Sequence, residues 1–191
     1  MRGAPDHCTS CGGALSGVDP PTVFRCDACG EYAFRNPTPN ARVVVLDGDS
    51  VLLVEIADEA RIEDPPYDAE SEWMTPGGAV EVGEHPDEAA ARELAEETGL
   101  VADPDALELF DAVTREVVED THALVLLYAA DRADVAGTPA AASDAADAWF
   151  WHPDELAAAD ATFRDLHDEP RRYRDLEGFV AAARAALEAD E

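Results

Sequence analysis

A cluster of glycines, carboxylates and one arginine in the middle of the chain has the residue types needed for metal chemistry. If residues 86–98 form a helix at 100° per residue, Glu93, Glu96 and Glu97 fall within one arc of about 100°. Three like charges on one turn repel each other unless a cation offsets them, and Mg²⁺ and Mn²⁺ prefer oxygen ligands. The spacing therefore predicts a divalent-metal site.

The ends of this helix are marked in the sequence. Pro86 suits a first helical position, and Gly99 suits the left-handed residue just past a C-terminus. Ala91, Leu94 and Ala95 form a stripe of mostly small residues, which predicts close packing on a sheet. Before the helix, the turn at residues 76–78 brings backbone close to a ligand, and a carbonyl group of Gly77 is expected to complete the coordination.

A competing interpretation needs no chemistry. The chain is acidic and rich in alanine, so a solvated helix face also explains Glu93, Glu96 and Glu97. The number of positions that match at once favours the metal site.

The full pattern is glycine, five residues, glutamate, seven residues, then Arg-Glu-Leu-x-Glu-Glu-x-Gly-Leu, from Gly78 to Leu100. It resembles the complete signature of the Nudix hydrolases, and no position departs from it. The resemblance implies an α/β fold, a three-layer α/β/α sandwich with a mixed sheet. It also implies hydrolysis of a nucleoside diphosphate linked to another group, through a metal-activated water.

The resemblance also implies roles for individual residues. Glu93, Glu96 and Glu97 resemble the metal ligands, and Gly77 and Gly78 the backbone beside them. Arg92 and Glu84 resemble a pair that orients the loop and helix, for which a structural role is at least as expected as a catalytic one. The chemistry agrees, because cations neutralise a pyrophosphate and lower the pKa of a bound water. No covalent nucleophile is needed, and the scattered histidines His85, His122, His152 and His167 show no triad spacing.

The second strong pattern uses every cysteine in the chain. Two Cys-x-x-Cys-Gly knuckles, at residues 8–12 and 26–30, predict a structural zinc ribbon in which Cys8, Cys11, Cys26 and Cys29 bind Zn²⁺. Each glycine follows a second thiolate, where a tight turn aims N–H groups at sulfur. Two disulfides are the competing interpretation, disfavoured because residues 1–6 contain no apolar targeting segment and the remaining domain has no cysteine.

A ribbon followed by this signature resembles the zinc-ribbon branch of the family, which includes the NADH pyrophosphatases. Those members carry a Ser-Gln-Pro-Trp-Pro type motif soon after the signature, and residues 101–107 contain nothing similar. We expect a zinc ribbon at 1–36, a Nudix domain at 37–160 and a C-terminal helical extension at 161–191.

Strands are expected at residues 42–46, 51–56, 107–118, 122–130 and 148–151. The first two read as a hairpin around the turn at 47–50, and 57–72 as an acidic loop. Apolar spacing predicts an amphipathic helix over 173–187.

Two further kinds of site residue remain open. Family members often place one more acid outside the signature, and the candidates are Asp147, Asp144, Glu116 and Glu119, with Asp147 preferred because it precedes the last strand. Among the aromatic residues, Trp73, Trp149, Trp151 and Tyr67 have faces that could stack on a purine, and Trp73 is preferred because it precedes the glycine turn.

Composition restricts the partners. The 191 residues have a formal net charge of −30, with 43 acids and 13 basic residues, all arginine. That charge repels nucleic acid and anionic membranes at low salt, and it resembles the cytoplasmic proteins of salt-accumulating halophiles. We therefore expect a cytoplasmic protein that binds a nucleotide-derived small molecule and no nucleic acid or membrane, with a homodimer expected by analogy.

Three functions stay open at this point. The first is a Mg²⁺ or Mn²⁺ dependent pyrophosphohydrolase, with ADP-ribose or a similar compound favoured. The second is a non-catalytic nucleotide-sensing regulator with the same fold. The third is an NADH or dinucleotide pyrophosphatase. A further interpretation, an RNA-processing enzyme or interaction module that uses the ribbon, is disfavoured by the charge balance.

Overall fold

The computed structural model of the chain describes residues 7–57, 70–118, 121–142, 145–164, 173 and 175–189. The chain divides into two units, residues 1–38 with 116–123, and residues 39–115 with 124–191. None of the helices in these described segments is long and apolar enough to cross a membrane.

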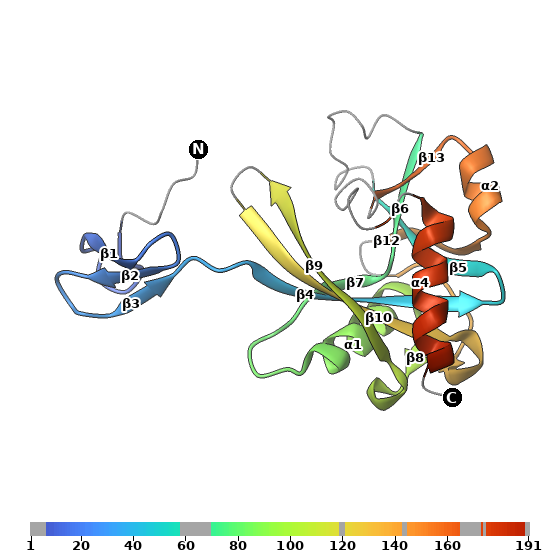
Figure 1. Cartoon of the computed structure of the whole chain (residues 1–191), viewed down its shortest axis with the longest axis horizontal. Helices are drawn as coiled ribbons and strands as arrows, with labels where there is room; N and C mark the ends of the chain where they lie inside the picture. Colours follow the sequence, from blue (N-terminus) through green and yellow to red (C-terminus); the bar gives the residue numbers. More distant parts are fainter. Residues whose placement is uncertain are drawn as a thin grey trace. The chain divides into compact units, whose positions relative to one another are not determined.

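The first unit contains a three-stranded antiparallel sheet in the order β1-β2-β3 (Figure 1). Its strands are β1 (Leu15–Asp19), β2 (Val23–Cys26) and β3 (Tyr32–Phe34). Their pairing places Leu15 opposite Cys26. The strands therefore connect the two cysteine knuckles.

The second unit is built on a mixed sheet in the order β13-β6-β5-β4-β10-β9, with β12 paired to β5 and β7 paired to β4. The sheet is mixed because β13 runs parallel to β6, while the other recorded pairs are antiparallel. Its strands are β4 (Thr38–Asp47), β5 (Ser50–Ile56), β6 (Ser71–Met74), β7 (Gly77–Ala79), β9 (Glu108–Val118), β10 (Thr121–Asp131), β12 (Ala145–Trp151) and β13 (Ala161–Phe163). Strands β8 (Val101–Ala102) and β11 (Val135–Ala136) form a separate pair.

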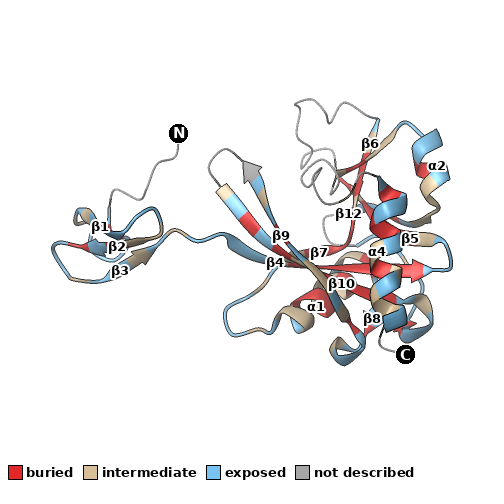
Figure 2. Ribbon diagram, viewed as in Figure 1, coloured by how far each residue is buried: buried red, intermediate tan, exposed pale blue. Residues whose placement is uncertain are grey.

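Residues 41–46 of the central strand β4 are buried on both faces of the sheet, the red part of β4 in Figure 2. On one face, Val43 and Val45 belong to the same apolar cluster as Ala89, Ala90 and Leu94 of helix α1 (Pro86–Thr98). Because side chains alternate along a strand, Val44 and Leu46 point to the other face. The fold therefore needs a second covering layer.

Helix α4 (Leu176–Ala189) provides that layer. Its Phe179 packs on Phe163 of β13 and Phe110 of β9, with ring centroids 5.4 and 5.9 Å apart. Its Arg184 donates to the carbonyl oxygen of Gly48, at 2.5 Å, in the turn between β4 and β5. The predicted α/β/α sandwich with a mixed sheet is thus confirmed. The remaining helical segments are α2 (Pro153–Ala158), η2 (Pro104–Ala106) and η3 (Arg132–Asp134).

The predicted hairpin is confirmed, since Leu46 pairs with Val51 and Asp47 with Ser50. The predicted loop at 57–72 is wrong at its end, because Ser71 and Glu72 belong to β6, and residues 58–69 lie outside the described part. Strand β6 forms against β13, far along the chain, so local sequence does not reveal it. The C-terminal helix begins at Leu176, three residues later than predicted.

Candidate functional site

Helix α1 carries the acidic cluster and has well-defined ends. At its start, the backbone N–H of His85 donates to Glu88 Oε2 at 3.0 Å, and Pro86 is the first helical residue. At its end, Gly99 adopts the left-handed conformation with φ of 69°, and its N–H donates to the carbonyl of Ala95 at 3.0 Å. Both predicted boundaries are confirmed.

The glycine turn lies directly against the carboxylates. The N–H of Gly77 donates to Glu97 Oε2 at 2.9 Å. A Cβ on Gly78 would lie 2.5 Å from the carboxyl carbon of Glu93, and the φ of Gly77 is 149°, a conformation open to glycine. The two glycines therefore let the strand β7 backbone approach Glu93 and Glu97 closely.

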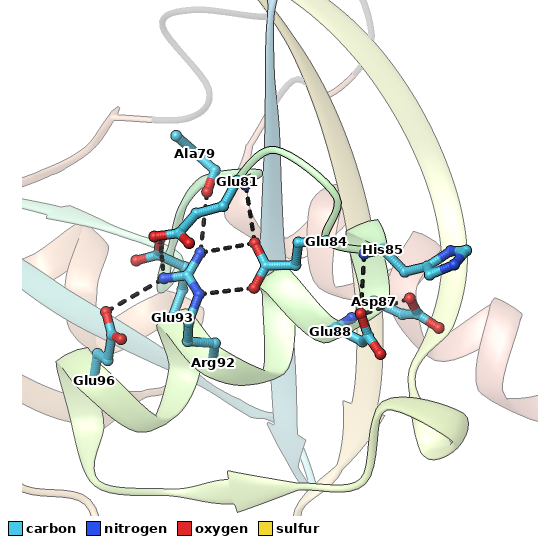
Figure 3. Close-up of polar contacts among 9 residues, drawn as sticks. All are labelled: Ala79, Glu81, Glu84, His85, Asp87, Glu88, Arg92, Glu93 and Glu96. Atoms are coloured by element: carbon cyan, nitrogen blue, oxygen red, sulfur yellow. Dashed lines mark hydrogen bonds and ion pairs between the residues drawn. The ribbon is translucent and has the colours of Figure 1, made fainter.

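Arg92 is the centre of an ion-pair network, drawn in Figure 3. Its Nε and Nη2 donate to the two carboxylate oxygens of Glu84, at 2.8 and 3.1 Å. Its Nη1 donates to Glu93 at 2.8 Å and to Glu96 at 3.3 Å, and its Nη2 also donates to the carbonyl of Ala79 at 3.1 Å. One guanidinium thus joins the loop, the strand and the helix.

This network fixes the ionisation of its two central groups. The hydrogen bonds from Arg92, and then the N–H of Glu81, lower the pKa of Glu84. The Glu84 and Glu93 carboxylates raise the pKa of Arg92. The pair is therefore held in its charged form, and the bidentate geometry fixes the orientation of the loop at residues 79–84.

The three helix carboxylates are suited to a hard cation but are not drawn together. Glu93 and Glu96 point their oxygens at Arg92, and Glu97 at Gly77. Among the described residues, these three carboxylates do not belong to any tight cluster of three or more possible metal-binding side chains. Their all-oxygen donor set fits Mg²⁺ or Mn²⁺, and a cation would compete with Arg92 for the oxygens of Glu93 and Glu96.

The four cysteines form a compact cluster in the first unit. Their sulfur atoms all lie within 4.8 Å of one another, with 3.7 Å between Cys8 and Cys29 and 3.5 Å between Cys11 and Cys26. A tetrahedral zinc site with Zn–S bonds of about 2.3 Å has edges of about 3.8 Å, so the cluster fits Zn²⁺. All four cysteines are free of disulfides.

The knuckle turns supply the expected donors to sulfur. Both Gly12 and Gly30 have positive φ, at 73° and 78°. The N–H of Cys29 donates to Cys26 Sγ at 3.5 Å, and this bond is the main reason that the pKa of Cys26 falls to about 6. Backbone N–H groups at Cys11 and Ser10 lower the pKa of Cys8 in the same way. For Cys11 and Cys29 the backbone donors at Gly13 and Glu31 also lower the pKa, but the contacts with neighbouring cysteine side chains outweigh them and raise it. Thiolates are the form that binds zinc.

A comparison with known families agrees with this geometry. The model of the NUDIX domain matches residues 36–172. The chain belongs to the Nudix family. It is 30% identical over 93 residues to the "NAD-capped RNA hydrolase NudC" of Pseudomonas aeruginosa, an alignment that covers 49% of this chain and 30% of that protein. The Nudix chain thus spans about a third of the length of this curated relative.

Solved structures share the fold. A Nudix hydrolase from Nitrosomonas europaea matches with a TM-score of 0.59 and 20% identity, covering 88% of this chain and 90% of its own. A bifunctional NMN adenylyltransferase/ADP ribose pyrophosphatase from Francisella tularensis, complexed with AMP and a manganese ion, matches with a TM-score of 0.53 and 21% identity. That match covers 71% of this chain and 40% of the other. At these identities the likeness shows the Nudix fold alone.

Two of the four candidates for an additional acid lie among the described residues. Asp147 lies exposed in β12 and accepts a hydrogen bond from the N–H of Ala148 at 2.7 Å. Glu116 lies in β9, and Asp144 and Glu119 lie outside the described residues. None of the four is assigned by these contacts, so the preference for Asp147 stays a prediction.

The aromatic candidates differ in exposure. Trp73 is 5% exposed and packs edge-on against Trp151 at 5.1 Å between centroids, while Trp149 is 60% exposed. Tyr67 lies outside the described residues. The structure thus gives Trp73 a packing contact, and its contact with substrate stays a prediction.

Sequence reasoning missed two residues beside the glycine turn. Arg42 of β4 is 4% exposed, and its Nη1 donates to the carbonyl of Thr75, itself fully buried, at 2.5 Å. The available signal was an arginine at the start of the run Val43-Val44-Val45, in a strand buried on both faces.

Proposed function

We propose that this Nudix protein hydrolyses a pyrophosphate bond in a nucleoside diphosphate linked to another moiety, using Mg²⁺ or Mn²⁺ and a metal-activated water. The observation that carries the proposal is the close approach of the Gly77 and Gly78 backbone to the Glu97 and Glu93 carboxylates, through the Gly77 N–H to Glu97 and the space beside Gly78 that Glu93 fills. Family membership and the complete signature from Gly78 to Leu100 support the same chemistry.

In this proposal the residues have distinct roles. Glu93, Glu96 and Glu97 hold the divalent ion, with the carbonyl of Gly77. The ion, when bound, neutralises phosphate charge and lowers the pKa of a water. Arg92 and Glu84 are positioning residues, because their bidentate pair fixes the loop against the helix.

The substrate proposal is ADP-ribose or a similar compound, a nucleotide-derived small molecule. A dinucleotide such as NADH is the second candidate, and the 30% identity to NudC favours it. Against it, residues 101–107 lack the Ser-Gln-Pro-Trp-Pro type motif and form β8 and η2 instead. A nucleotide-sensing regulator without turnover is the third candidate, disfavoured by the intact signature.

The ribbon is proposed to be a structural zinc module at residues 1–36, ahead of a catalytic domain at 37–160 and a C-terminal extension at 161–191. We propose a cytoplasmic, salt-adapted protein of the zinc-ribbon branch, with a homodimer as the expected assembly. The ribbon adds no basic surface for nucleic acid, since residues 1–36 contain three arginines, Arg2, Arg25 and Arg35, and four acids.

The test is product release from ADP-ribose, NADH, dinucleoside polyphosphates and nucleoside triphosphates in molar KCl with Mg²⁺ or Mn²⁺. We compare the wild type with Glu97→Gln and with the control Glu188→Gln, an exposed residue of α4. Removing a metal ligand is expected to lower turnover by at least about a hundredfold, and the control is expected to have no effect.

Each result has a clear meaning. Turnover of one compound that Glu97→Gln abolishes establishes the hydrolase and its substrate class. Folded, zinc-loaded protein that turns over no compound, yet binds one of them, overturns the hydrolase and supports the regulator.

A further inference from the structure

Arg42 is the one charged residue in the buried stretch 41–46 of β4, whose other members are apolar. It lies in β4 with 4% of its surface exposed, and the next three residues are valines that are fully buried. Burying a guanidinium costs several kcal/mol unless its N–H groups are satisfied, so its position needs a specific reason. That reason is found in the turn that precedes Gly78.

The guanidinium holds this turn through its backbone. Its Nη1 donates to the carbonyl of Thr75 at 2.5 Å, and Thr75 is completely buried. One residue along, the N–H of Val43 donates to the carbonyl of Pro76 at 2.9 Å. Strand β4 thus fixes two successive carbonyl groups of the turn, one through a side chain and one through its backbone.

The same arginine also touches the next residue of the turn. Arg42 pairs with Gly77 across β4 and β7. A Cβ on Gly77 would come within 2.6 Å of both Cα and Cγ of Arg42, which shows that the arginine stem lies directly against the Gly77 backbone. The Gly77 N–H in turn donates to Glu97 Oε2 at 2.9 Å.

These contacts form a continuous chain from Arg42 through the turn to a carboxylate of helix α1. We propose that Arg42 is a positioning residue for the metal site, which sets the Gly77 backbone and, through it, Glu97. The inference rests on the proposed function and adds to it a residue outside the family signature. Because Arg42 is buried, it acts through the turn and not by contact with substrate.

The substitution Arg42→Met removes the charge and the donors but keeps an extended apolar stem. We expect Mn²⁺ to bind at least about tenfold more weakly without substrate, since partners that orient metal ligands usually contribute this much. Electron paramagnetic resonance of free Mn²⁺ measures the affinity. Arg42→Lys, with one compact donor group, should lie between wild type and Arg42→Met.

The matched control is Arg184→Met. Arg184 also donates to a carbonyl in a turn, that of Gly48, just after the C-terminal end of β4. Its loss should leave Mn²⁺ binding unchanged. Metal affinity is a property of the folded molecules, so a general loss of stability would not move it, and thermal melts in molar KCl check folding.

A double substitution tests whether Arg42 acts through Glu97. If it does, Arg42→Met should weaken Mn²⁺ binding much less in the Glu97→Gln background than in wild type. Hydrogen exchange at the Gly77 amide should also become faster in Arg42→Met and remain slow in Arg184→Met, because only the first change loosens the turn.

Folded Arg42→Met that binds Mn²⁺ like wild type, with a slow Gly77 amide, would overturn the inference. If Arg42→Met does not fold, Arg42→Lys decides by the same two measurements. Wild-type protein that binds no Mn²⁺ would instead overturn the proposed function, and the Gly77 exchange rate would still decide whether Arg42 orders the turn.

Discussion

The carboxylate of Glu93 lies where a side chain at residue 78 would have to be. In Gly78→Ala the new Cβ would stand 2.5 Å from the Glu93 carboxyl carbon, so Glu93 must turn away. We expect Mn²⁺ affinity and turnover to fall at least about tenfold with little change in thermal stability. Isothermal titration with Mn²⁺ and a thermal melt measure the two effects.

A suitable control for this change is Gly178→Ala in α4, where the new Cβ would meet, among the described residues, the side chain of Asp175 at 3.2 Å. That variant should bind Mn²⁺ like wild type. Unaltered Mn²⁺ binding by Gly78→Ala would show that Glu93 is not a ligand in the position described.

The Arg92–Glu84 ion pair should make the stability of the protein depend on pH. Hydrogen bonds from Arg92 lower the folded-state pKa of Glu84. The pair therefore stabilises the protein fully above the unfolded pKa of about 4.3, and this contribution is lost as pH falls through the folded value. The difference in unfolding free energy between wild type and Glu84→Gln should thus be largest near neutral pH and shrink below about pH 4.

Denaturant unfolding of both proteins from neutral to acidic pH gives this difference. Other carboxylates titrate in both proteins and largely cancel, and Glu188→Gln serves as the exposed control. A difference between wild type and Glu84→Gln that stayed constant on acidification would contradict the stabilising role of the ionised pair.

Only part of this site could be predicted at the level of residues. The helical period placed Glu93, Glu96 and Glu97 on one arc, and a local rule suffices for that. The bonds from Arg92 to Glu93 and Glu96 depend on rotamers, which spacing does not reveal. Arg42 was missed because its partner, Thr75, lies 33 residues further along the chain, in the connection between β6 and β7.

At the scale of elements, the sequence predicted the features that are stabilised by contacts between neighbouring residues. The turn between β4 and β5 and the caps of α1 were readable from neighbouring residues. The short strands β7, β8, β11 and β13 were not, because their two or three residues carry no period of their own. They exist through partners that are distant in sequence, as β13 does against β6.

The ribbon strands lack an apolar core of their own. Among described residues 7–36, the buried apolar side chains are Phe24, Cys8 and Cys26, two of which are proposed zinc ligands. So small a module needs a cross-link to fold, and we expect the proposed zinc to supply its folding free energy. Removing zinc should unfold residues 7–36 and leave the sheet and helices of the second unit folded.

Two-dimensional NMR of amide groups reads each unit separately. Addition of a strong chelator, or the substitution Cys26→Ser, should collapse the ribbon resonances to random-coil positions while those of α1 and β4 stay dispersed. Loss of dispersion in both units together would contradict an independent second unit, and retention in both would contradict a structural zinc.

At the scale of the whole molecule, the charge of −30 sets the conditions for folding. Unfolding moves like charges apart, so their repulsion destabilises the compact state at low salt. The Debye length falls from about 30 Å at 0.01 M salt to about 3 Å at 1 M, which removes most of that repulsion. We expect the melting temperature to rise by more than about 10 °C over this range of KCl.

A salt effect alone does not identify screening, because concentrated salt also strengthens apolar burial. Measurements at two pH values distinguish charge screening from stronger apolar burial, since the net charge approaches zero near the sequence pI of about 4.1. Repulsion is absent there, so the rise in melting temperature with KCl should be much smaller at pH 4 than at pH 7. An equal rise at both pH values would assign the salt effect to apolar burial, and no rise at pH 7 would contradict salt adaptation altogether.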